Sequence, residues 1–309
     1  MTDIYIISGF LGAGKTTLIQ KLLADAFRGK QVALIENDFG EASVDAALLK
    51  ESGFQVKELS SGCICCTLTG DFVSALASLL KSCSPEIILI EPSGVGKLSD
   101  VERACRDEKL AQTVRVAGRI TVVDVKRCER YLENFGEFFE DQIRHADTVL
   151  FSRTADCPER IPQAEKAVRA LNPHAVLFTG DWDSLGAEEI LQVSSEHVHE
   201  NEVCACHAHH THEDGCCHTA DESFDTLTLR FGHAVELAEI SGRLAALDSP
   251  QYGTILRAKG ILACTDGSYT LQYLPGDLKI EEANAHGSEL SIIGRDLAKE
   301  KLTALFAGL

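Results

Sequence analysis

The sequence of 309 residues has no long hydrophobic run and no excess of basic residues. No stretch approaches the roughly 20 consecutive apolar residues that a membrane-spanning helix requires. The first ten residues lack the basic and apolar regions of a secretory signal peptide, so we expect a cytoplasmic protein that does not bind membranes. Basic residues number 29 against 47 acidic ones, giving a formal net charge of −18. That charge argues against nucleic acid as the main partner.

Disulfide bonds are also not expected, although the chain contains 12 cysteines. Thiols stay reduced in the cytoplasm, so this number indicates metal or redox chemistry. The densest group is SGCICC (61–66), which places three thiols in four positions. Cys63 and Cys65 are too close for a comfortable disulfide, whereas their spacing suits a soft metal ion. The alternative is a group of buried cysteines that pack as small hydrophobic side chains.

A phosphate-binding loop is predicted near the N-terminus. An apolar strand is expected at 4–7 and a helix at 18–27, and between them lies the Walker A pattern Gly9-x-x-x-x-Gly14-Lys15-Thr16. Backbone N–H groups of such a loop surround the β-phosphate of a nucleotide, and the helix N-terminus adds a favourable dipole. Lys15 is predicted to reach the β- and γ-phosphates and to serve catalysis, and Thr16 to ligate Mg²⁺. The candidate phosphate-binding residues are Gly9, Gly12, Ala13, Gly14, Lys15, Thr16 and Thr17.

Strand-like and helical segments alternate through the first half of the chain. The apolar, β-branched runs lie at 32–37, 54–59, 86–91, 119–124 and 147–152. This alternation predicts an α/β fold, with a P-loop NTPase parallel sheet and helices on both faces. Such sheets bind ligands at the carboxyl ends of their strands. Glu91 and Gly94 lie at one such end, where P-loop proteins hold the Mg²⁺ shell and contact the γ-phosphate; Glu91 is therefore a catalytic candidate and Gly94 a nucleotide-binding one.

A second metal-binding segment is predicted further along the chain. Residues 197–218 contain seven of the eleven histidines and four of the cysteines, and they lack apolar periodicity. We interpret them as a solvated linker that binds Zn²⁺ or, through imidazole, Ni²⁺ or Co²⁺. The alternative is a disordered tether of accidental composition. The candidate ligands are Cys204, Cys206, His207, His209, His210, His212, Cys216 and Cys217.

The chain resembles the CobW-like family of metallochaperone GTPases, relatives of the UreG and HypB nickel-insertion proteins. The matching segments are SGFLGAGKTTL (8–18), IENDFGEASVD (35–45), SGCICC (61–66), IEPSG (90–94), VVD (122–124), RAKGIL (257–262) and IGRDL (293–297). The resemblance implies an internal metal site formed by Cys63, Cys65 and Cys66, with Glu36 and Glu41 as partners. It also implies GTP or GDP with Mg²⁺, and a Zn²⁺ cargo for which Co²⁺, Ni²⁺ or Fe²⁺ could substitute.

The resemblance also suggests three regions. Residues 1–195 are expected to form a P-loop GTPase domain, and 196–222 a His/Cys-rich linker. Residues 223–309 would form a C-terminal domain like that of CobW. Its strand-like patterns at 224–232 and 269–276, with a helical pattern at 235–247, predict a small α+β domain.

The segment expected to contact the nucleobase departs from the family pattern. The usual guanine-binding motif is Asn-Lys-x-Asp, and the candidate residues here are Ser152, Arg153 and Thr154, followed by Ala155. Ala155 cannot accept hydrogen bonds from the guanine ring, although Asp156 stands one position later. Discrimination against adenine is therefore expected to weaken, because polar pairing is what rejects the wrong base.

Three functions remain compatible with these motifs. The first is a slow GTPase that delivers Zn²⁺ or a related ion to a client apo-metalloprotein. The second is a metal buffer without catalysis, and the third is a small-molecule kinase on the same scaffold. Metal-dependent phosphate release would separate the first from the second. The client stays unnamed, and a homodimer is left open.

Overall fold

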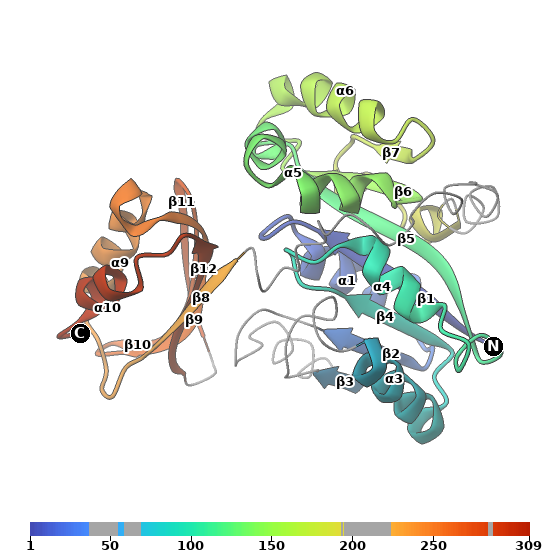
Figure 1. Ribbon diagram of the computed structural model, residues 1–309, viewed down its shortest axis with the longest axis horizontal. Helices are drawn as coiled ribbons and strands as arrows, with labels where there is room; N and C mark the ends of the chain where they lie inside the picture. Colours follow the sequence, from blue (N-terminus) through green and yellow to red (C-terminus); the bar gives the residue numbers. More distant parts are fainter. Residues whose placement is uncertain (37–54, 59–68, 193, 195–223, 284–286) are drawn as a thin grey trace, which may run out of the picture. The chain divides into compact units, whose positions relative to one another are not determined.

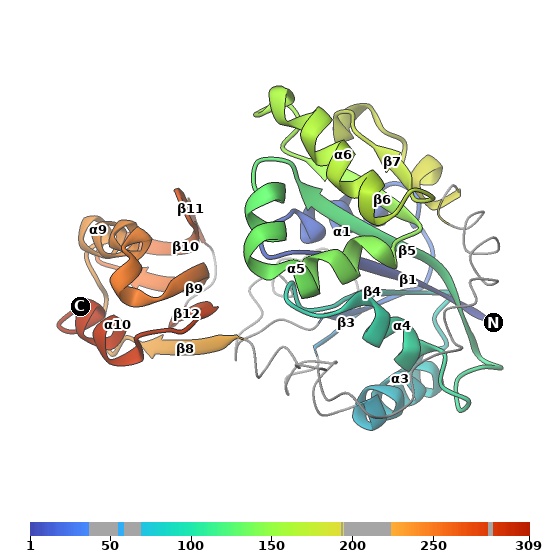
Figure 2. The same cartoon turned by 45° about the horizontal axis from the view of Figure 1, so that its top comes forward.

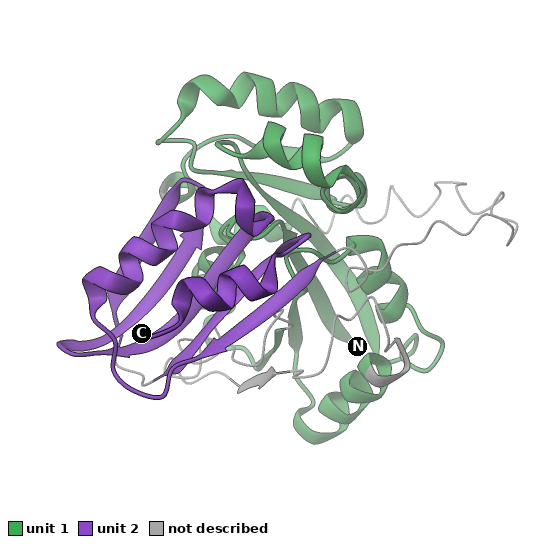
Figure 3. Ribbon diagram, turned by 60° about the vertical axis from the view of Figure 1, so that its left-hand side comes forward, with its two compact units in different colours: residues 1–38, 45–217 green, residues 39–44, 218–309 purple. Residues whose placement is uncertain are grey.

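The structure is a computed structural model that describes residues 1–36, 55–58, 69–192, 194, 224–283 and 287–309. It divides into two compact units, shown in different colours in Figure 3. The described residues up to 194 belong to the first unit, and those from 224 onward belong to the second. Among the described residues, no helix is both long enough and apolar enough to cross a membrane.

A parallel sheet forms the centre of the first unit (Figure 1). Over the described residues it has seven strands in the order β3-β2-β4-β1-β5-β6-β7, and every neighbouring pair is parallel. The predicted parallel α/β fold is thus confirmed. The strands are β1 (Thr2–Gly9), β2 (Val32–Glu36), β3 (Gln55–Glu58), β4 (Ile87–Glu91), β5 (Val114–Asp124), β6 (Thr148–Ser152) and β7 (Val176–Phe178).

Helices cover both faces of this sheet (Figure 2). Tyr5 and Ile7 of β1 pack against α1 and the helical segment 187–192, whereas α4 and α5 contact β1 from the other face. Because both faces are buried, the strands are nearly continuous apolar runs and do not alternate with polar residues. The helices are α1 (Lys15–Ala24), α3 (Thr69–Cys83), α4 (Leu98–Cys105), α5 (Cys128–Arg144) and α6 (Ile161–Leu171), with 3₁₀ turns η1 (Pro158–Arg160) and η2 (Trp182–Ser184).

The second unit is an antiparallel sheet with two helices, so the predicted α+β architecture is confirmed (Figure 3). Its five described strands follow the order β11-β10-β9-β12-β8. A separate core forms where Ile240 and Leu244 of α9 and Leu302 of α10 pack with the sheet. The elements are β8 (Asp225–Arg230), α9 (Leu237–Ala245), η4 (Ala246–Asp248), η5 (Pro250–Tyr252), β9 (Thr254–Cys264), β10 (Gly267–Leu274), β11 (Asp277–Glu282), β12 (Ser288–Arg295) and α10 (Lys299–Phe306).

Candidate nucleotide site

The predicted phosphate loop connects the end of β1 to the start of α1. Gly9, Gly12 and Gly14 have φ angles of 144°, 69° and 110°, which side chains with a Cβ rarely adopt. A Cβ on Gly9 would also lie 2.5 Å from the Val122 carbonyl oxygen of β5. The backbone conformation therefore favours glycine at all three positions. At Gly9 there is also no room for a Cβ atom. The loop can thus turn its backbone N–H groups toward a bound anion.

Three polar side chains converge beside this loop. The Thr16 hydroxyl lies 3.5 Å from both carboxylate oxygens of Glu91, at the end of β4. The Lys15 ammonium lies 3.9 Å from Glu91 Oε1. Lys15 and Glu91 are each 7% exposed, so a charged pair is held almost out of water. Buried charges are costly unless they are paired, and this pairing satisfies that requirement.

A second carboxylate stands next to Glu91 on the neighbouring strand. Glu36 ends β2, is 3% exposed, and is the register partner of Glu91. Glu58 at the end of β3 is in turn the register partner of Glu36. Three adjacent strands thus end in glutamate at the same edge of the sheet. Glu36, predicted as a metal ligand, is brought next to Glu91, predicted to hold Mg²⁺.

The loop after β4 touches the phosphate loop directly. A Cβ on Gly94 would lie 2.9 Å from the Leu11 backbone nitrogen, so only glycine permits this approach. The Gln142 side-chain amide of α5 donates hydrogen bonds to the carbonyl oxygens of Gly94 (3.2 Å) and Gly96 (2.8 Å). From the same helix, the Tyr131 hydroxyl donates to the Leu11 carbonyl oxygen at 3.3 Å. Helix α5 therefore anchors both loops, a role that the sequence analysis missed.

The segment predicted to contact the base is anchored by Asp124 at the end of β5. Its carboxylate, 1% exposed, accepts hydrogen bonds from Arg127 (2.7 Å) and from the Lys126 backbone N–H (2.8 Å). Arg153 Nε lies 2.9 Å from the same carboxylate, and its φ of 59° is left-handed. Arg153 is thus directed to Asp124. The VVD motif contained Asp124, but nothing local in the sequence paired it with Arg153.

The other residues of this segment differ in burial. Thr154 is buried, whereas Ala155 and Asp156 are exposed. Ser152 ends β6, and within the described residues its buried Oγ has no hydrogen-bond partner. Thr17, the remaining phosphate-loop candidate, is exposed on the first turn of α1. Asp156 lies one residue beyond Ala155, the position at which the guanine-binding motif has its aspartate.

The remaining metal-ligand candidates lie outside the described residues. They are Glu41, Cys63, Cys65, Cys66, Cys204, Cys206, His207, His209, His210, His212, Cys216 and Cys217. Within the part of the chain that the structure describes, no group of three or more His, Cys, Asp or Glu side chains could hold a metal ion. Two other cysteines, Cys105 and Cys128, are buried, and burial raises the pKa of each thiol to about 12. Burial and a raised pKa are typical of cysteines that pack as small apolar residues.

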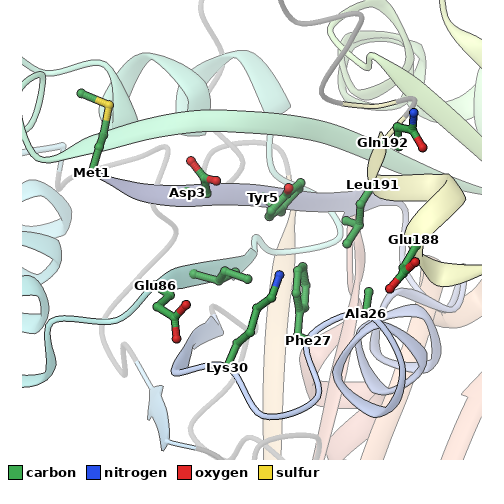
Figure 4. A pocket seen from close by; sticks show the side chains of 11 residues that line it. Met1, Asp3, Tyr5, Ala26, Phe27, Lys30, Glu86, Glu188, Leu191 and Gln192 are labelled. Atoms are coloured by element: carbon green, nitrogen blue, oxygen red, sulfur yellow. The ribbon is translucent and has the colours of Figure 1, made fainter.

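A hollow of about 530 Å³ lies at the opposite edge of the sheet (Figure 4). The rings of Tyr5 and Phe27 line it, with centroids 5.6 Å apart. Burial raises the pKa of the Tyr5 hydroxyl. The charged side chains Lys30, Glu86 and Glu188 line the hollow but are exposed at its rim. The hollow thus lacks the buried charges that mark the edge with the phosphate loop.

The fold and the phosphate loop define a P-loop nucleotide-binding protein. Residues 3–179 match the CobW/HypB/UreG nucleotide-binding domain, and residues 224–309 match the cobalamin synthesis protein cobW C-terminal domain. The chain belongs to the CobW/HypB/UreG family. The predicted resemblance is therefore confirmed, and both matched segments coincide with the two described sheets.

The chain is also similar to curated proteins and to a solved structure. The zinc chaperone YjiA of Escherichia coli (strain K12) is 27% identical over 98% of this chain and 97% of its own length. The zinc chaperone CobW of a Sinorhizobium species is 29% identical over 82% and 79%. A crystal structure of Zn(II)-bound YjiA GTPase from E. coli has a TM-score of 0.48, with 20% identity and coverage of 100% and 98%.

Proposed function

We propose that this protein is a GTP-hydrolysing metallochaperone. It binds Zn²⁺ or a related divalent ion at Cys63, Cys65 and Cys66, and hydrolysis of GTP gates transfer of that ion to a client apo-metalloprotein. The observation that carries the proposal is the register of Glu36 with Glu91. A candidate ligand of the transported metal and a candidate ligand of Mg²⁺ end neighbouring strands, so a change at one site has a short path to the other.

The residues of the phosphate loop fit a nucleotide with Mg²⁺. Glycines with positive φ free the backbone N–H groups for the phosphates, and the buried Lys15 supplies a cation. Thr16 and Glu91 offer oxygen atoms within 3.5 Å of each other, and Mg²⁺ prefers such hard ligands. Bound Mg²⁺ would neutralise charge on the β- and γ-phosphates. Lys15 would then exchange part of its contact with Glu91 for the phosphate oxygens.

The length of chain between β3 and the cysteines is compatible with a metal site at the same edge. Cys63 follows Glu58 by five residues, and five extended residues span at most about 17 Å. Strands β3 and β2 are neighbours, and neighbouring strands lie about 4.8 Å apart. Chain length therefore allows Cys63 to approach Glu36, as the proposed metal site requires. Thiolates with a carboxylate make a suitable tetrahedral set for Zn²⁺.

The relatives support the transported metal and the chemistry. YjiA and CobW are named zinc chaperones, and a relative from Dictyostelium discoideum, 28% identical over 60% of this chain and 47% of its own length, is named zinc-regulated GTPase metalloprotein activator 1. We extend zinc binding, GTP hydrolysis and a client protein from these names to this chain. The His/Cys tract would add weaker metal ligands.

Phosphate release from GTP, measured with and without Zn²⁺, tests the proposal. We expect slow hydrolysis by the wild type that depends on Mg²⁺ and changes with Zn²⁺. The triple variant Cys63→Ser, Cys65→Ser and Cys66→Ser should keep hydrolysis but lose the Zn²⁺ response. Hydrolysis insensitive to Zn²⁺ would contradict the gating of metal transfer, and Zn²⁺ binding without any hydrolysis would indicate a metal buffer. Phosphate transfer to an added small molecule would indicate a kinase.

A further inference from the structure

Trp182, the single tryptophan of the chain, lies between two parts of the candidate nucleotide site. It begins η2, just after β7, and its indole N–H donates a 2.6 Å hydrogen bond to the Phe151 carbonyl oxygen of β6. The turn itself is closed by Leu185 N–H, which donates to the Trp182 carbonyl oxygen at 3.2 Å. The indole is therefore fixed against the end of β6, one residue before the segment expected to contact the base.

The benzene edge of the indole faces the phosphate loop. Its Cη2 atom is 3.4 Å from the point where a Cβ on Gly14 would lie, and the Cβ of Ser152 is 3.9 Å from that point. Gly14 has a φ of 110° and precedes the first turn of α1. Its conformation sets the direction of the following N–H groups and of Lys15. The indole edge thus lies beside the residue on which the phosphate cradle depends and leaves little free space there for a side chain.

Ser152, at the end of β6, has a short side chain beside the same point. The guanine-binding motif has asparagine at this position, which offers an amide to neighbouring backbone groups. Ser152 Oγ is buried and makes no hydrogen bond to any described residue. Ser152 therefore does not tie β6 to the phosphate loop by polar contact. The indole donates a hydrogen bond to Phe151 and has its other edge beside Gly14.

We propose that Trp182 is a positioning residue for nucleotide binding, which joins the phosphate loop to the end of β6 by packing in place of a polar side chain at position 152. This proposal rests on the nucleotide-binding function proposed above. Trp182 acts through Gly14 and the phosphates, so its effect does not depend on the base. As the single tryptophan, it also reports on the site, because nucleotide binding changes the surroundings of its ring.

Calorimetric binding of GDP and ADP to Trp182 variants tests the proposal. Trp182→Ala should weaken both nucleotides by the same factor, on the order of ten- to hundred-fold, the scale of a positioning error of about 1 Å. Trp182→Phe keeps a ring against Gly14 and should recover most of the affinity. Leu185→Ala is the matched control. Leu185 lies in the same segment and packs on the same core, but the three atoms nearest to a Cβ on Gly14 belong to Trp182 and Ser152. It should bind close to wild type.

The outcomes separate this proposal from the proposed function. Wild-type affinity in Trp182→Ala, together with lost affinity in Lys15→Ala, would overturn the positioning role and leave nucleotide binding intact. Equal losses in Trp182→Ala and Leu185→Ala would also overturn it, because the loss would then reflect general destabilisation. Indole emission unchanged at saturating GDP would contradict it as well. Absence of nucleotide binding by the wild type would instead refute the proposed function.

Discussion

The two ends of β4 each carry a glutamate, and the two side chains have different surroundings. Glu86, just before the strand, is exposed and accepts a hydrogen bond from the Gln31 backbone N–H at 3.2 Å. Glu91, the last residue of the strand, is 7% exposed and lies beside Thr16 and Lys15. The same residue type is thus a solvated surface group just before the strand and a buried charge at the end of it. Glu91 can contribute to a ligand site because it lies at the carboxyl end of the strand, beside the phosphate loop.

The comparison extends to the loops around each end. The carboxyl ends meet glycine-rich turns with positive φ, and no side chain intervenes between Gly94 and the backbone of Leu11. The amino ends meet a hollow of about 530 Å³ with exposed charges at its rim. The hollow offers space but no buried charged group among its lining residues. Convergence of buried polar groups favours the phosphate loop, and such convergence is the better indicator of function.

The largest expected effect comes from removing the buried cation. Lys15→Ala should lower GTP hydrolysis by about 10²- to 10³-fold or more, the scale of one lost electrostatic contact to the reacting group. Lys30→Ala, which removes an exposed cation at the other edge, should leave hydrolysis unchanged. Phosphate release under single-turnover conditions measures both. Equal effects of the two changes would show that the phosphate loop is assigned to the wrong edge.

The two glutamates of β4 provide the next test. Glu91→Gln should weaken Mg²⁺ binding by about ten- to hundred-fold, the usual cost of altering the groups that hold a metal. The rate should recover as Mg²⁺ is raised. Glu86→Gln, the matched control at the other end, should show wild-type Mg²⁺ dependence. Titration of hydrolysis with Mg²⁺ measures the shift, and parallel curves for both variants would contradict the role of Glu91.

Two aspartates that form ion pairs differ in burial, so neutralising them should cost different amounts of stability. Asp124 is 1% exposed and pairs with Arg127 and Arg153, so Asp124→Asn should cost about 3 kcal/mol of unfolding free energy by leaving buried charge uncompensated. Asp3 pairs at 2.8 Å with Arg115, whose side chain is 55% exposed, so Asp3→Asn should cost about 0–1 kcal/mol. Urea unfolding followed by circular dichroism measures both. A larger loss of unfolding free energy in Asp3→Asn than in Asp124→Asn would contradict this prediction.

The smallest expected effect on hydrolysis comes from removing residues 199–218. The chain enters this tract shortly after Gln192, which lines the hollow at the amino edge. Deletion should lower the amount of Zn²⁺ bound per chain while hydrolysis and the thermal midpoint stay near wild type. Metal analysis and a thermal scan of the purified variant give both quantities. Unchanged metal content would show that the tract is not a metal-binding segment.

Local patterns predicted the sheet and the phosphate loop because the causes are local. Continuous apolar runs predicted β1, β2, β4 and β6, and the glycine spacing predicted the turn between β1 and α1. Strand β9 was not predicted. Its segment RAKGIL was noted for the family resemblance, but the lysine and glycine in it interrupt the apolar pattern of a strand. The structure gives the reason for Gly260: a Cβ there would lie 2.1 Å from the Glu289 carbonyl oxygen of β12. That constraint comes from a neighbouring strand.

The contacts that fix the candidate site could not be predicted in the same way. Gln142 holds Gly94 across 48 residues, and Trp182 reaches Phe151 across 31 residues. Each pairing depends on how helices and turns pack on the sheet, and no periodicity in the sequence encodes it. The sequence indicated the glutamates at the ends of β2 and β4 as two separate candidates. Their register, and so their adjacency, appears only once the strand order is known.

The central claim is that the transported metal and the nucleotide are energetically coupled through the edge where Glu36 and Glu91 meet. The most direct test is titration of Zn²⁺ into apo, GDP-bound and GTP-analogue-bound protein. We expect Zn²⁺ affinities that differ among these states by about 5- to 150-fold, the range of typical couplings, and GTP affinity must then change by the same factor when Zn²⁺ is bound. The triple Cys→Ser variant at 63, 65 and 66 should lose the tight site and the coupling but still bind nucleotide. Identical Zn²⁺ affinities in all three states would contradict the claim.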